Sequence, residues 1–339
     1  MDRAPVTVDL ALQGGGAHGA FTWGVLDRLL EEEWLTIEGL SGTSAGAMNA
    51  AVMAAGFASG GAAGARKALD GYWNAVAEAG RYSPFQRSPL DRMAGRWTMD
   101  SSPLFIGMDL FSRLFSPYDV NPGSFNPLQK LLAEHIEFDR LKTSPIQLFI
   151  TATNVRTGRG RVFRNAEITP EVLMASACLP TLFQAVEIDG EPYWDGGYSG
   201  NPTITPLVRD LVSDDTILVP LNPVERPGVP RSASEIMNRL NEVSFNAVLL
   251  KELRMMALLR KVADPGTTEG AQWARMRFHM VPNRLMATLG YSSKLNTEWE
   301  FLSMLKTEGR ASAADFLQRN GDKLGVSSTI DLDILLEGV

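Results

Sequence analysis

Short runs of aliphatic and β-branched residues alternate with helix-period segments along much of the chain. Residues 6–12 form such a run, and residues 17–32 then place apolar side chains three and four positions apart. A second strand is predicted around Leu40, with an alanine-rich helix after it at residues 47–57. Further strands are predicted at 146–153, around Val162, at 186–188 and at 216–221, and further helices at 127–136 and 202–211. This alternation predicts an α/β fold, a three-layer α/β/α sandwich with a mainly parallel central sheet.

An aromatic- and proline-rich insertion interrupts this alternation at residues 81–125. Its eight aromatic residues are Tyr82, Phe85, Trp97, Phe105, Phe111, Phe115, Tyr118 and Phe125. Two interpretations stay open for the insertion. It forms a lid or a wall of an acyl-chain pocket, or it is a small core of short helices packed on the main body.

The C-terminal region, residues 226–339, is expected to be a mostly helical extension packed on a catalytic domain of residues 1–225. Apolar positions at steps of three and four predict a long helix over residues 234–262. Between Arg226 and Arg284, 10 basic residues stand against 5 acidic ones. A basic helical face of this kind rests on an anionic membrane surface or is simply solvated.

Composition narrows the class of protein and its surroundings. The 39 acidic residues outnumber the 32 basic ones, which disfavours a nucleic-acid partner. The single cysteine, Cys178, excludes an intramolecular disulfide and a Cys-rich zinc site. The N-terminal residues show no secretory signal, so we expect a cytoplasmic protein with peripheral contact at the inner face of the membrane. The uncharged stretch 39–65 is mostly small residues, which predicts a loop and a buried helix rather than a membrane span.

The pattern Gly42-x-Ser44-x-Gly46 falls between a predicted strand and a predicted helix. A nucleophile elbow needs this arrangement, because a tight turn exposes the serine hydroxyl while glycines remove the side chains that would block it. The alternative is a helix cap at Thr43 or Ser44, which needs no catalysis.

A glycine-rich loop at residues 14–19 follows the first strand and precedes the first helix. Successive backbone N–H groups in such a loop can point at one anion, aided by the positive end of the helix dipole. That anion is the oxyanion of an acyl-transfer intermediate or the pyrophosphate of a dinucleotide, since Gly14, Gly16 and Gly19 fit G-x-G-x-x-G. The second strand ends in the serine motif rather than in an acidic residue that could bind a ribose, which disfavours the dinucleotide.

A serine nucleophile needs a general base, and the chain holds only three histidines, His18, His135 and His279. A Ser-Asp-His order would require His279, yet the fold that uses this order places its elbow after several strands. The other candidate base is Asp195, because Gly196 and Gly197 after it permit a tight turn. An ordinary β-turn would also explain this Asp-Gly-Gly sequence.

Together these motifs resemble the patatin-like phospholipase family. The C-terminal region is also similar to the tails of some bacterial members of that family. The matching stretches are residues 13–19, Gly42-Thr43-Ser44-Ala45-Gly46 and Asp195-Gly196-Gly197, with 175–180 and Asn201-Pro202 as further similar stretches. The similarity covers about residues 8–211.

The resemblance implies lipid acyl hydrolase or lysophospholipase chemistry. Ser44 would attack an ester carbonyl and Asp195 would take its proton, with no third member, no metal and no cofactor. Gly14, Gly15 and Gly16 would form the oxyanion hole, beside elbow glycines 42 and 46 and second-motif glycines 196 and 197. The loop position that is often Arg or Lys in the family is His18 here. A catalytically silent lipid-binding module remains as an alternative of another class.

Overall fold

One central sheet organises the chain. The computed structural model describes residues 3–81, 83, 86–121 and 123–335. The strands follow the order β5-β6-β3-β2-β1-β7-β8, with β4 also paired to β3. Their bounds are β1 Val6–Leu12, β2 Leu35–Gly42, β3 Gln147–Asn154, β4 Gly160–Arg164, β5 Val186–Ile188, β6 Glu191–Asp195, β7 Asp215–Val219 and β8 Arg277–Met280. The five strands from β3 to β8 in this order pair in parallel, while β4, β5 and β6 pair antiparallel. The predicted mainly parallel sheet is therefore confirmed.

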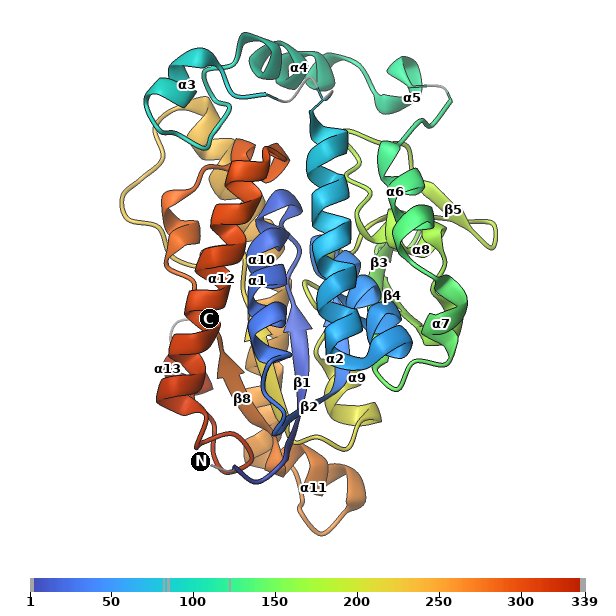
Figure 1. The fold of residues 1–339 in the computed structure, drawn as a ribbon, viewed down its shortest axis with the longest axis vertical. Coiled ribbons are helices and arrows are strands. Elements are labelled where there is room, and N and C mark those ends of the chain that lie inside the picture. The colour runs from blue at the N-terminus through green and yellow to red at the C-terminus, as the bar shows by residue number, and fades with distance from the viewer. Residues whose placement is uncertain (1–2, 82, 84–85, 122, 336–339) are drawn as a thin grey trace.

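Helices cover both faces of this sheet (Figure 1). Side chains alternate across a strand, so Leu10 and Leu12 of β1 join one apolar cluster and Ala11 joins the other. The first cluster is shared with α1 (Gly19–Leu29), α2 (Ala45–Gly80) and α12 (Trp299–Asn320). The second is shared with α9 (Thr205–Asp210), α10 (Ala233–Val262) and α11 (Thr268–Arg275). These two cores make the three-layer sandwich expected from the sequence.

The remaining helices have between 4 and 12 residues. They are α3 Pro89–Met93, α4 Pro103–Leu114, α5 Pro117–Val120, α6 Pro127–His135, α7 Phe138–Lys142, α8 Pro170–Ser176 and α13 Leu332–Leu335. Among them, α6, α7 and α8 also contribute to the first apolar cluster. No helix in the described part of the chain is long and apolar enough to cross a membrane.

Helix α2 is longer than the segment predicted at residues 47–57. It continues to Gly80, although the backbone at Gly60 and Gly61 is not helical. Its first turns are buried almost completely, because the alanine-rich sequence lets the helix approach its neighbours closely. The uncharged stretch 39–65 is thus the end of β2, a turn and a buried helix, as expected.

The insertion at residues 81–125 carries α3, α4 and α5 across one end of the molecule, beyond the C-terminal end of α2 (Figure 1). Large apolar side chains are exposed there, with Leu90, Met93, Leu114 and Phe125 each at least 71% accessible. Tyr82 and Phe85, counted among its aromatic residues, lie outside the described residues. The insertion is thus a set of short helices with an exposed apolar surface.

The C-terminal region is part of the same sandwich. Strand β8, which the sequence analysis did not predict, pairs in parallel with β7 and extends the sheet. Only four residues long, it is too short for its alternation to stand out. Helix α12 packs on α1 where two glycines meet, because a Cβ at Gly24 would collide with the Lys306 carbonyl and one at Gly309 with the Phe21 carbonyl. A strand and a buried helix therefore tie residues 226–339 to the preceding chain.

Candidate active site

Ser44 occupies a sharp turn between β2 and α2, at the carboxyl end of the parallel strands, where α/β sheets place their sites. Its backbone has φ 54° and ψ −121°, a conformation that non-glycine residues rarely adopt. The neighbouring glycines have no room for a side chain: a Cβ at Gly42 would lie 2.6 Å from the Gly46 carbonyl oxygen, and one at Gly46 would collide with that of Leu12. The Ser44 N–H donates a 2.9 Å hydrogen bond to Ser176 Oγ, which further fixes the turn.

Asp195 ends strand β6 and caps the short 3-10 helix of residues 196–198. Its carboxylate is 1% exposed, and Oδ1 accepts a 2.7 Å hydrogen bond from the Gly197 N–H. Burial raises the pKa of Asp195 to about 7, although the Gly197 N–H, the Ser44 hydroxyl and the Lys294 charge act in the opposite direction. A carboxylate with this pKa is poised to accept a proton near neutral pH.

The glycine loop packs directly on the serine turn. A Cβ at Gly14 would lie 2.9 Å from Ser44 Cβ, and Gly16 has φ +59°, which favours glycine. The Gly14 N–H already donates a 2.8 Å hydrogen bond to Asn201 Oδ1. The N–H groups of Gly15 and Gly16 have no hydrogen-bond partner among the described residues. These two amides are the ones available to an incoming oxyanion.

Glycines 196 and 197, after Asp195, also lie in crowded surroundings. A Cβ at Gly196 would collide with the Thr151 carbonyl, and one at Gly197 with the ring of Phe245. These residues are therefore glycines because strand β3 and helix α10 leave no space beside the Asp195 turn.

None of the three histidines lines the cavity that holds Ser44. His18 Nε2 lies 2.7 Å from Ser293 Oγ, and burial, together with the nearby Lys294 and Arg226 charges, lowers its pKa well below the usual value. His135 Nδ1 lies 3.0 Å from the Leu131 carbonyl oxygen. His279 is buried in β8, where its Nε2 lies 2.8 Å from Asp215 Oδ1. Their positions favour Asp195 over a histidine as the partner of Ser44.

Ser44, Asp195 and the loop glycines open into one cavity of about 360 Å³. Its wall is largely apolar and comes from α2, α6, residues 177–183 and α10, through Met48, Tyr72, Trp73, Val76, Leu128, Leu131, Leu179, Leu182, Phe183 and Phe245. Within the described part of the insertion at 81–125, only Ser83 contributes to the lining. Most of the apolar lining therefore comes from α2, α6 and residues 177–183 rather than from the described part of the insertion.

Three residues of this site were not singled out as site residues in the sequence analysis. Ser176 accepts the Ser44 N–H, Asn201 accepts the Gly14 N–H, and Lys294 lines the cavity from the C-terminal region. Ser176 and Asn201 lie in stretches already noted for their family similarity, whereas no local pattern marks Lys294. Among the described residues, no group of three or more His, Cys, Asp or Glu side chains gathers where it could hold a metal ion.

The family model for patatin-like phospholipase matches residues 10–208. Among solved structures, the chain is similar to VipD from Legionella pneumophila, with 16% identity and a TM-score of 0.39 over 99% of this chain and 85% of that one. No curated protein matches. The family match contains Ser44, Asp195 and the glycine loop, and it ends before Lys294.

Proposed function

The chain belongs to the patatin-like phospholipase family, and on that premise we propose that it is a serine acyl hydrolase that cleaves lipid esters with a Ser44–Asp195 dyad. One observation carries the proposal. A serine in a strained turn and a buried carboxylate with its pKa near 7 share one apolar cavity. This pairing supplies a nucleophile, a base and a place for an acyl chain.

In the proposed reaction, Ser44 Oγ attacks the ester carbonyl carbon while Asp195 accepts the hydroxyl proton. The negative charge that develops on the carbonyl oxygen is stabilised by the free N–H groups of Gly15 and Gly16. The Gly14 N–H, already bonded to Asn201, holds the loop in place. The tetrahedral intermediate then collapses, and the proton on Asp195 passes to the departing alcohol oxygen.

The acyl-enzyme is hydrolysed by the same groups. Asp195, again ionised, takes a proton from a water molecule as that water attacks the acyl carbon. The second tetrahedral intermediate releases a carboxylic acid and returns the proton to Ser44 Oγ. No group outside the dyad and the loop amides is required for the proton transfers.

The apolar cavity favours a particular length of acyl chain in the substrate. Each methylene buried from water gains about 0.8 kcal/mol, so a wall of aromatic and aliphatic side chains favours medium and long acyl chains over acetyl. Ser83, near the start of the exposed apolar insertion, and Asn126, directly after its end, both line this cavity. We propose that this surface contacts the membrane or micelle from which the lipid is drawn.

A fluorophosphonate probe tests the proposal, because it reacts only with an activated serine. We expect covalent labelling of the purified protein, and loss of that labelling in Ser44→Ala. Ser59→Ala, which removes an ordinary helix serine, is the matched control and should label like the wild type. Absence of labelling in the folded wild-type protein would overturn the proposal and favour a silent lipid-binding module. The glycine loop packs on Ser44, which disfavours the alternative that this loop binds a dinucleotide.

A further inference from the structure

Lys294 reaches the catalytic cavity from a part of the chain outside the family match. It belongs to the 3-10 helix Tyr291–Leu295 and lines the cavity together with Ser44 and Asp195. Its main chain abuts the glycine loop, because a Cβ at Gly16 would collide with the Lys294 carbonyl. The ammonium therefore belongs to the site that holds the nucleophile.

The Lys294 ammonium has unused hydrogen-bonding capacity. Nζ donates one hydrogen bond, 2.5 Å long, to Asn222 Oδ1, and Asn222 Nδ2 in turn donates to the Gly14 carbonyl at 2.9 Å. Within the described chain, Lys294 forms no ion pair with an acidic side chain. Nζ also lies over the Tyr291 ring, 5.4 Å from its centre. An ammonium carries three N–H donors, so two hydrogen bonds can still be made to a ligand.

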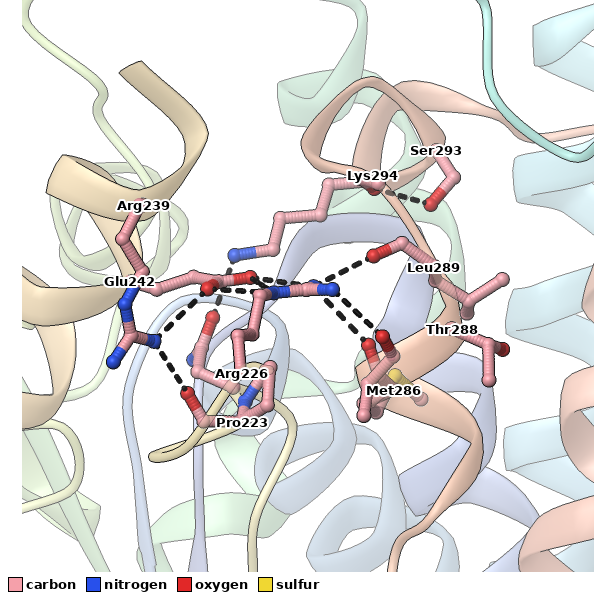
Figure 2. A network of polar contacts seen from close by, with 12 residues as sticks. Pro223, Arg226, Arg239, Glu242, Met286, Thr288, Leu289, Ser293 and Lys294 are labelled. Carbon is pink, nitrogen blue, oxygen red and sulfur yellow. Dashed lines mark hydrogen bonds and ion pairs between the residues drawn. The ribbon is translucent and has the colours of Figure 1, made fainter. Parts of the chain in front are cut away.

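Glu242 is the acidic residue whose charge acts most strongly on Lys294, and it is already neutralised by arginines. Glu242 accepts hydrogen bonds from Arg226 at 2.7–2.9 Å and from Arg239 at 3.3 Å (Figure 2). Arg226 also donates to the carbonyl oxygens of Met286 and Leu289, which fixes the segment leading to Lys294. This network carries two positive charges and one negative charge before Lys294 is added.

The surroundings leave the Lys294 charge poorly compensated. Burial above all, and also Arg226, lower the pKa of Lys294 to about 8, although Glu242 and Asp195 act in the opposite direction. An anionic ligand would replace the hydration that the ammonium has lost. His18 lies on the same side of the loop, but its lowered pKa leaves it uncharged.

We propose that Lys294 is a specificity-determining residue that binds the phosphate group of a phosphate-bearing acyl ester while the ester carbonyl lies at Ser44. This inference rests on the proposed acyl hydrolase function and deepens it. Phospholipids and lysophospholipids are the substrates that the family already implies, and in them the phosphate lies a few bonds from the scissile ester. The phosphate takes the two free N–H donors of Nζ, and the acyl chain fills the apolar cavity.

Two substrates with the same acyl chain separate phosphate recognition from catalysis. One is a 1-acylglycerol 3-phosphate and the other the neutral 1-acylglycerol, both used below their micellar concentrations. We expect Lys294→Met to lower the ratio of kcat/KM for the phosphate ester to kcat/KM for the neutral ester at least about 10-fold, the loss typical of a charge-assisted hydrogen bond. Lys294→Arg should retain most of the preference, and Lys323→Met, an exposed lysine outside the cavity, should behave like the wild type.

A binding measurement separates this inference from the function on which it rests. In Ser44→Ala protein, which cannot turn over, calorimetry with sn-glycerol 3-phosphate should detect binding that Lys294→Met abolishes. Inorganic phosphate at the same concentration shows whether a free anion binds equally well. Labelling of Lys294→Met by the neutral fluorophosphonate probe shows that the hydrolase machinery is intact.

The possible outcomes are distinct. An equal loss of kcat/KM on both esters would overturn the inference, because Lys294 would then act only through Asp195 or the glycine loop. Unchanged kinetics on the phosphate ester would overturn it too. Absence of fluorophosphonate labelling in the folded wild-type protein would overturn the proposed function, whatever the calorimetry shows.

Discussion

The rate of ester hydrolysis should follow the ionisation of Asp195 through neutral pH. A carboxyl group with a pKa of about 7 is about 10% ionised at pH 6 and about 90% ionised at pH 8. Because the ionised form is the base, kcat/KM should rise about 10-fold over this interval, whereas a carboxylate near its ordinary pKa would give a flat profile.

The cause of the shift can be tested in the same experiment. Burial is the largest cause and raises the pKa, while the Lys294 charge lowers it. Lys294→Met should therefore move the inflection to higher pH, and Lys323→Met should leave it in place. Hydrolysis of a neutral monoacylglycerol, followed by chromatography of the released fatty acid from pH 5 to 8.5, gives the profile. An inflection near pH 4, or a profile that is flat above pH 5, would refute the reasoning.

Four further predictions follow from the structure. Ser44→Ala and Asp195→Asn should each lower ester hydrolysis about 10³-fold or more, since nucleophile and base act together; near-normal turnover by either folded variant would exclude the dyad. His135→Ala and His279→Ala should keep kcat, although the latter should lower the free energy of unfolding by about 1–3 kcal/mol because it leaves a buried Asp215 hydrogen bond unmade; loss of kcat in folded His279→Ala would instead indicate a triad. Burial, and then Glu38, raise the pKa of Asp9 to about 9, so the native state keeps a proton that the unfolded state loses. The free energy of unfolding should therefore fall by up to about 1.4 kcal/mol per pH unit from about pH 4 to 9. Denaturant titrations at several pH values that give Asp9→Asn the same pH dependence of unfolding free energy as the wild type would contradict this. Medium or long acyl esters should be cleaved faster than acetyl esters, and co-sedimentation with anionic vesicles should drop at high salt; equal recovery on neutral and anionic vesicles would assign the basic segment to solvated surface.

Two basic residues of the segment at residues 226–284 are paired with buried carboxylates. Arg226 is paired with Glu242, and Arg277 is paired with the buried Asp215. The charges of both arginines are therefore used to pair with buried carboxylates. The remaining exposed basic residues leave a weaker case for electrostatic binding to lipid than the sequence alone suggested, whereas the exposed apolar insertion strengthens the case for direct contact.

Local patterns carried most of what the sequence could predict. The first strand, the glycine loop and the serine turn follow each other within 46 residues, so short-range chemistry reveals their order and their geometry. Asp195 was recognisable because its two following glycines mark a turn. In the structure, the glycine loop, Ser44 and Asp195 line one cavity.

Long-range pairing was beyond the sequence. Strand β8 is defined by its partner β7, 62 residues earlier at Asp215 and Arg277, rather than by any pattern of its own. The place of Lys294 beside Gly16 likewise depends on how a distant segment folds back. A lid or a wall of the acyl pocket was one of two interpretations of the aromatic insertion. In the structure, α2, α6 and residues 177–183 supply most of the apolar lining, because aromatic content does not show which way the side chains point.

The contact between α1 and α12 has a genetic consequence. The two helices meet at Gly24 and Gly309, and α1 begins directly after the glycine loop. A premature stop codon between residues 209 and 299 would leave every codon of the family match intact and yet strip the covering layer from α1. Such alleles should behave as nulls, and missense alleles that place any larger residue at Gly24 or Gly309 should resemble them, although neither position lies in the catalytic cavity.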